Sequence, residues 1–134
     1  MGNKNYKFAN FEQVQQCIKS LNRNNNILLN TLPIDKQHCV IASSIPAVNE
    51  ETIINRMIGE GVMQNVDIIV YGKNYRDESI YNKYNQLRKL GFTNVSIYGG
   101  GMFEWLLLQE VYSADNFPTS GKELDILMYS VLET

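Results

Sequence analysis

The sequence predicts an α/β fold: one domain with a five-stranded parallel sheet and helices on both faces. Short apolar runs alternate with segments whose apolar residues recur at helical spacing, which is the pattern of parallel strands connected by helices. The runs are apolar throughout, as expected for strands that are covered on both sides. We expect the strands near residues 6–9, 27–30, 38–42, 66–71 and 94–98 of the 134-residue chain.

The first half of the chain should supply three strands and two helices. Asn10 precedes apolar residues at helical spacing, so it is expected to cap a helix that runs to about Asn22. The following asparagines should end that helix, because Asn readily adopts turn conformations. After the third strand, Asn49 is expected to cap a helix from Glu50 to about Ile58, which the next glycines would end.

The segment VDIIVY (66–71) is the clearest strand, because it is β-branched and nearly free of charge. Either Asp77 or Ser79 should cap the helix that follows, since both are favoured at that position. Gly91 is expected just beyond the end of this helix, where a left-handed conformation is common.

The last third of the chain predicts one more strand and two helices. After the strand NVSIY (94–98), three glycines turn into a helix from about Met102 to Val111. We assign these glycines to the turn and to close helix packing, because their spacing is not that of a dinucleotide-binding loop. A loop containing Pro118 should then lead to a final helix over 122–132.

Composition excludes several classes of function. The net charge of −2 argues against a general nucleic-acid binder, and the longest apolar run, WLLLQEV, is too short to span a membrane. The polar beginning of the chain does not predict a signal peptide. Cys17 and Cys39 lack the spacing of metal ligands, so we expect buried, reduced thiols, with a disulfide or redox pair as the alternative. Reduced thiols indicate a cytoplasmic protein, and we expect no metal or cofactor.

The stretch LGFTNVSIYGGGMFEW resembles the end of a rhodanese-like domain, in which Gly-Phe closes a helix, a strand follows, and Gly-Gly-x-x-x-Trp opens the next helix. Here these positions are Gly91-Phe92 and Gly100-Gly101-x-x-x-Trp105. The resemblance covers about residues 8–111. It implies one rhodanese-like α/β domain over 1–134, with a C-terminal loop and helix at 112–134. The segment 66–71 then looks like the family's central strand, which delivers the active-site loop.

The resemblance also implies a loss of catalysis. Sulfurtransferases of the family place a Cys directly after the central strand, and Gly72 stands there in this chain. Glycine offers no nucleophile, so we expect no catalytic residue. Arg76 lies near the place of the arginine of related phosphatases, but these need the same Cys. The predicted function is a non-catalytic binding or scaffold module, and the alternative is a sulfurtransferase or phosphatase with an atypical loop.

The loop between the central strand and the next helix is the predicted binding site for a protein partner or a small anion. Backbone N–H groups before a helix favour an anion, and we expect them to point into a shallow cradle. The candidate residues are Gly72, Lys73, Asn74, Tyr75, Arg76 and Ser79.

The loop cations, His38 and the tyrosines near the loop also have purely structural interpretations. The loop cations can equally be solvated surface charges, and His38 is interpreted as a structural residue with a catalytic base as its alternative. An aromatic contact surface around the loop is also expected, although Tyr81 and Tyr84 fit helix packing as well. Its four tyrosines are Tyr71, Tyr75, Tyr81 and Tyr84.

Overall fold

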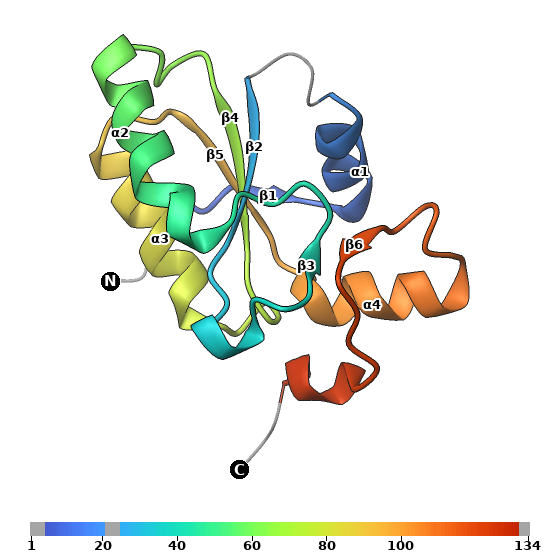
Figure 1. Ribbon diagram of the computed structural model, residues 1–134. Coiled ribbons are helices and arrows are strands. Elements are labelled where there is room, and N and C mark those ends of the chain that lie inside the picture. The colour runs from blue at the N-terminus through green and yellow to red at the C-terminus, as the bar shows by residue number, and fades with distance from the viewer. Residues whose placement is uncertain (1–4, 21–24, 132–134) are drawn as a thin grey trace.

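The computed structural model describes residues 5–20 and 25–131, and its main feature is a four-stranded parallel sheet (Figure 1). The strands lie in the order β1-β5-β4-β2. They are β1 (Phe8–Ala9), β2 (Asn26–Asn30), β4 (Asp67–Tyr71) and β5 (Asn94–Tyr98). Each neighbouring pair is parallel, so the predicted direction of these strands is confirmed.

The prediction of a fifth parallel strand at 38–42 is wrong. Strand β3 (Val40–Ile41) instead pairs antiparallel with β6 (Thr119–Ser120) in a separate two-stranded sheet. Beside β2, the place of a fifth strand is taken only by Ile45, which forms one isolated parallel bridge with Leu29. The main-chain N–H of Ile41 donates to the hydroxyl of Tyr71 over 3.0 Å, so a side chain replaces a ladder partner there.

Helices cover both faces of the sheet, as predicted (Figure 1). On one face lie α2 (Glu50–Glu60) and α3 (Glu78–Lys89), and on the other lie α1 (Phe11–Lys19) and α4 (Gly101–Val111). Within residues 5–20 and 25–131, no helix has the length and apolar character needed to cross a membrane.

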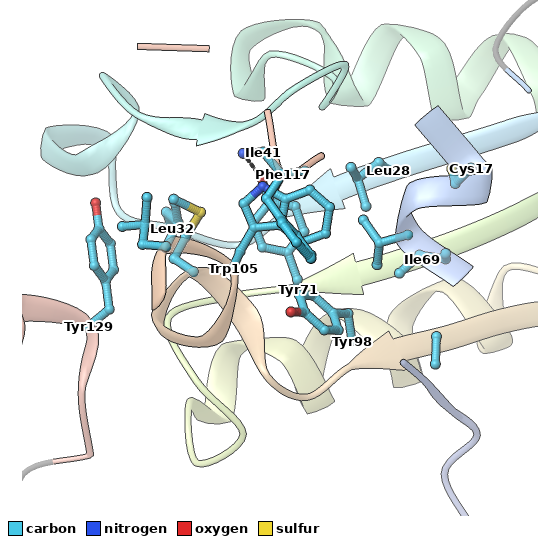
Figure 2. Packing of buried hydrophobic residues seen from close by; sticks show 14 of the residues in the cluster. Cys17, Leu28, Leu32, Ile41, Ile69, Tyr71, Tyr98, Trp105, Phe117 and Tyr129 are labelled. Atoms are coloured by element: carbon cyan, nitrogen blue, oxygen red, sulfur yellow. Dashed lines mark hydrogen bonds between the residues drawn. The ribbon is translucent and has the colours of Figure 1, made fainter. Parts of the chain in front are cut away.

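The core consists of two buried clusters, one on each face of the sheet, because successive strand residues point to opposite sides. Ile68 packs with the residues of α2 and α3, whereas Ile69 packs toward α1 and α4. Figure 2 shows the second cluster, in which Trp105 of α4 lies among aromatic side chains. Cys17 and Cys39 also belong to it; both are buried and free, as the sequence predicts.

Some helix ends follow their predicted caps and others differ: α2 was expected to stop at Gly59 and Gly61, but it continues through Gly59 and ends before Gly61. Asn10 accepts a bond of 2.9 Å from the N–H of Gln13, whose side chain accepts from the N–H of Asn10 in return. Asp77 caps α3 through Ser79. The side chain of Asn49 forms no cap, because the chain enters α2 from a 3₁₀ turn, η3 (Ala47–Asn49). The first helix, predicted to reach about Asn22, ends earlier, because α1 stops at Lys19 with Ser20 as its C-cap; residues 21–24 lie outside the described residues.

The prediction of a final α-helix over 122–132 is wrong within the described residues. The segment forms only a short 3₁₀ helix, η4 (Ile126–Tyr129). Tyr129 is fully buried, and its main-chain carbonyl accepts a bond of 2.7 Å from the side-chain amide of Asn74. Docking of this segment onto the loop after β4 therefore outweighs local helix propensity.

Candidate functional site

The loop from Gly72 to Asp77 leaves the carboxyl end of β4, which has a strand on either side, and leads into α3 (Figure 1). Helix α4 begins directly against it. The N–H groups of Met102 and Phe103 donate to the carbonyls of Gly72 and Lys73, each over 3.0 Å. Two of the orphan amides at the start of α4 are thus satisfied by the loop.

Gly101 makes this close approach possible. Its φ is +62°, and a Cβ there would lie 2.6 Å from the carbonyl oxygen of Gly72. Only glycine tolerates this conformation in so little space. The assignment of this glycine to close packing is therefore confirmed.

The carboxylate of Asp77 lies inside the loop and accepts hydrogen bonds from donors of Lys73 and Ser79. Its Oδ2 accepts from the N–H of Lys73 over 3.1 Å. Its Oδ1 accepts from the N–H and the hydroxyl of Ser79, over 3.1 Å and 2.7 Å. We expected the first amides of α3 to point without partners into an open cradle; for Ser79 this is wrong, because the chain provides its own anion.

Gly72 lies at the back of the same loop and has no space for a side chain. A Cβ at this position would lie 2.6 Å from Asp77 Oδ2, 2.7 Å from Thr31 Oγ1 and 2.8 Å from Ile80 Cγ2. All three distances are shorter than real Cβ contacts. The cavity that a nucleophile would need is therefore occupied by neighbouring side chains.

Thr31 is a site residue that the sequence analysis missed. Its hydroxyl lies 3.3 Å from the carbonyl of Tyr71 and 2.7 Å from the hydroxyl of Ser79. The signal was its position directly after β2, because the carboxyl ends of neighbouring parallel strands meet at one edge of the sheet.

The predicted loop residues lie together but differ in exposure. Gly72 and Asn74 are buried, Lys73 and Ser79 are half-buried, and Tyr75 and Arg76 are exposed. Asn74 is structural: its amide donates to Tyr129, and its oxygen accepts from the N–H of Arg76 over 2.9 Å. The surface that a partner can reach is the outer side of the loop.

The predicted aromatic surface is only partly correct. Tyr71 and Tyr84 are buried, and burial raises the pKa of the Tyr71 hydroxyl, which bonds to Ser44. Tyr75 is 59% exposed, and its carbonyl accepts a bond of 2.6 Å from the hydroxyl of the half-buried Tyr81.

An exposed aromatic residue on β1, Phe8, completes this surface and was missed. Phe8 is 55% exposed, and like Tyr75 it lies near Gly99. A Cβ on Gly99 would lie 3.6 Å from Tyr75 Cβ and 3.8 Å from the Phe8 ring. Both aromatic side chains therefore lie beside Gly99.

His38 has a structural role. Its Nε2 lies 2.6 Å from Oε1 of Glu123, which joins β3 to the C-terminal segment. This hydrogen bond lowers the pKa of the Glu123 carboxyl. Among the residues that the structure describes, no group of three or more His, Cys, Asp or Glu side chains is placed to hold a metal ion.

The family model of the rhodanese-like domain matches residues 13–108. The chain belongs to the rhodanese-like domain family. A comparison with curated proteins finds no significant match.

Solved structures share the fold of this rhodanese-like domain. The Alr3790 protein of Anabaena sp. has a TM-score of 0.59 at 20% identity, with 90% of this chain and 97% of that chain covered. The BH2092 protein of Bacillus halodurans has a TM-score of 0.60 at 18% identity, with 86% of this chain and 77% of that chain covered. The single-domain sulfurtransferase RDL2 of Saccharomyces cerevisiae has a TM-score of 0.54 at 17% identity, with 84% of this chain and 98% of that chain covered.

Replacing Asp77 by Ala should lower the free energy of unfolding of the rhodanese-like domain by about 1–2 kcal/mol, because α3 loses its cap and the loop loses its internal acceptor. Denaturant unfolding measures the change. Asp77→Asn should cost less, since Asn caps helices as well as Asp does. The exposed Asp35 provides a control, because Asp35→Ala should stay within about 0.5 kcal/mol. Equal effects of Asp77→Ala and Asp35→Ala would contradict the assigned contacts.

Proposed function

We propose that this rhodanese-like domain is a non-catalytic module that binds a protein partner on the outer side of the loop 72–79. The observation that supports this most is the packing around Gly72, where a Cβ would lie within 2.8 Å of three neighbouring side chains. In the family that the sequence resembles, sulfur transfer needs a Cys at this position. The thiolate is the nucleophile, and a glycine has none.

A protein partner fits the loop better than a small anion does. Asp77 uses the N–H groups of Lys73 and Ser79, and its negative charge opposes a second anion. On the outer side, the exposed side chains of Tyr75 and Phe8 both lie near Gly99. Exposed aromatic side chains are frequent anchors of interfaces, and a hydrogen-bonded loop loses little entropy on binding. Binding of sulfate or phosphate by Lys73 and Arg76 is the second candidate.

The alternative function is a sulfurtransferase or phosphatase with an atypical loop. The fold shared with the yeast sulfurtransferase favours this candidate. It would require Cys17 or Cys39, and burial raises the pKa of both thiols, that of Cys17 to about 11. Both would be protonated at neutral pH and poor nucleophiles.

In a thiosulfate:cyanide sulfurtransferase assay, the purified domain should show no turnover above the uncatalysed reaction, and a phosphatase assay should give the same result. The physical reason is the missing nucleophile at Gly72. A known sulfurtransferase run alongside shows that the assay works. Turnover that disappears in Cys17→Ser or Cys39→Ser would overturn the proposal in favour of the enzyme.

The binding part of the proposal needs its own measurement. A captured partner should be lost with Tyr75→Ala and kept with Tyr112→Ala, because Tyr112 is also exposed but lies at the end of α4. Stabilisation of the domain by sulfate or phosphate in thermal unfolding, without such a partner, would favour the anion instead.

We also propose a cytoplasmic location, because Cys17 and Cys39 are free and buried and the cytosol keeps thiols reduced. Fractionation of cells that express the tagged chain tests this proposal. Recovery from an oxidising compartment or from the membrane fraction would contradict it.

A further inference from the structure

An apolar cleft lies beside β2, the strand at one edge of the main sheet. Its volume is about 660 Å³, within the range of small-ligand sites. Ile34 and Val48 line it from the 3₁₀ turns η2 (Ile34–Lys36) and η3, and each of these side chains is 88% exposed. The residues that line the cleft in the described part of the chain include none of the loop 72–79.

Two side-chain amides in the wall of the cleft form a reciprocal hydrogen-bonded pair. Asn30 Nδ2 donates to Gln37 Oε1 over 3.3 Å, and Gln37 Nε2 donates to Asn30 Oδ1 over 2.7 Å. One edge of this pair is filled by a single residue, Leu32. Its N–H donates to Asn30 Oδ1 over 3.1 Å, and its carbonyl accepts from Gln37 Nε2 over 2.9 Å.

The opposite edge of the amide pair is unused. A primary amide has two N–H donors, and its oxygen can accept two bonds. One N–H of Asn30 and one lone pair of Gln37 Oε1 form no hydrogen bond with any residue of 5–20 or 25–131. Both amides line the cleft, whereas Leu32 does not, so the unused edge faces the cleft. Asn30 is only 4% exposed, so its free N–H is not a solvated surface group.

The chemistry of the cleft limits what can occupy it. Its unused edge offers a donor and an acceptor side by side, as the edge filled by Leu32 does, so the N–H and C=O of one further residue fit it. Among the described residues that line the cleft, none carries a charge. A charged group that enters would therefore lose its hydration without gaining a partner. The cleft favours a stretch of main chain with an apolar side chain.

We propose that this cleft binds an extended, uncharged segment of another polypeptide. The N–H of one residue of that segment donates to Gln37 Oε1, and its C=O accepts from Asn30 Nδ2. Its apolar side chain packs against Ile34 and Val48. In such recognition of extended peptides, main-chain hydrogen bonds give affinity and the side-chain contacts give specificity. The inference does not depend on the function proposed for the loop.

Titration of the isotope-labelled whole chain with the blocked peptide acetyl-Ala-Leu-Ala-amide, followed by nuclear magnetic resonance, tests the ligand class. The side-chain amide signals of Asn30 and Gln37 should shift to saturation. Methylation of the leucine nitrogen removes the donor, and aspartate in place of leucine adds a charge. Each change should weaken binding about tenfold, through a lost hydrogen bond or an unpaired buried charge. Absence of shifts in the two amide signals, or equal binding of the three peptides, would overturn the proposal.

Variants test the location of the site. Val48→Asp should weaken binding of the leucine peptide about tenfold, because a charge would lie against its apolar side chain. Leu124→Asp is the matched control, since Leu124 is 92% exposed and lies outside the cleft. Gln37→Met removes the acceptor and should cause a similar loss. Circular dichroism shows whether that variant folds, and Val48→Asp remains the test if it does not. Unchanged affinity in Val48→Asp would refute the assignment. None of these results bears on the sulfurtransferase assay, so the two proposals fail separately.

Discussion

Trp105→Ala should lower the free energy of unfolding by about 3–5 kcal/mol, the largest single effect that we expect. The side chain is fully buried in the cluster between the sheet and α4 (Figure 2). Its ring lies 5.1 Å from that of Phe117 and 6.1 Å from that of Tyr98, both edge-on. Truncation removes these contacts and leaves a cavity that the surrounding helix and sheet cannot fully close.

The same substitution also removes a hydrogen bond. Trp105 Nε1 donates to the carbonyl of Pro118 over 3.0 Å, just before β6. Loss of Trp105 should therefore loosen the C-terminal segment as well as the core. Trp105→Phe keeps an aromatic ring without the donor and should fall between wild type and Trp105→Ala.

Circular dichroism in a denaturant series measures these changes. Leu107→Ala is the matched control, because Leu107 lies on the exposed side of the same helix, and its replacement should cost less than about 1 kcal/mol. A Trp105→Ala protein as stable as Leu107→Ala would contradict the packing described for α4.

The strands 67–71 and 94–98 could be predicted from sequence, and so could the helix that carries Trp105. Each depends on a local signal: the Gly-Gly-x-x-x-Trp spacing, or an apolar run rich in β-branched residues. Position 38–42 shows the limit of such signals. An apolar run predicts burial but not the strand partner, and the partner of β3 is β6, near the other end of the chain.

The C-terminal segment differed from its prediction for a related reason. Its apolar spacing fits a helix, yet Tyr129 is held by a bond from Asn74, a contact between residues distant in sequence. In the loop 72–79, too, the local feature could be predicted from sequence and the longer-range contact could not. Sequence offers Asp77 as one of two candidate helix caps, beside Ser79. It does not show that the second carboxylate oxygen turns back to Lys73, which depends on the path of the whole loop.

Gly72→Cys should lower the free energy of unfolding by about 1–3 kcal/mol and should not yield a persulfide in thiosulfate. The new Cβ would lie 2.6 Å from Asp77 Oδ2 and 2.7 Å from Thr31 Oγ1, so these hydrogen-bonded side chains must move to admit it. The neighbouring carboxylate would also raise the pKa of the thiol. A nucleophilic persulfide-forming cysteine needs a lowered pKa, which is the opposite effect.

Gly59→Cys is the matched control, because a Cβ at Gly59 meets nothing within 4 Å on the exposed side of α2. Its thiol should titrate near the ordinary value of about 8.5. The thiol in Gly72→Cys should titrate above that value, and adding Asp77→Asn should lower its pKa again by removing the negative charge. Mass spectrometry after thiosulfate treatment detects any persulfide. A Gly72→Cys protein as stable as Gly59→Cys that also takes up sulfur would show that the loop still accepts a nucleophile. The packing at Gly72 would then no longer support a non-catalytic role.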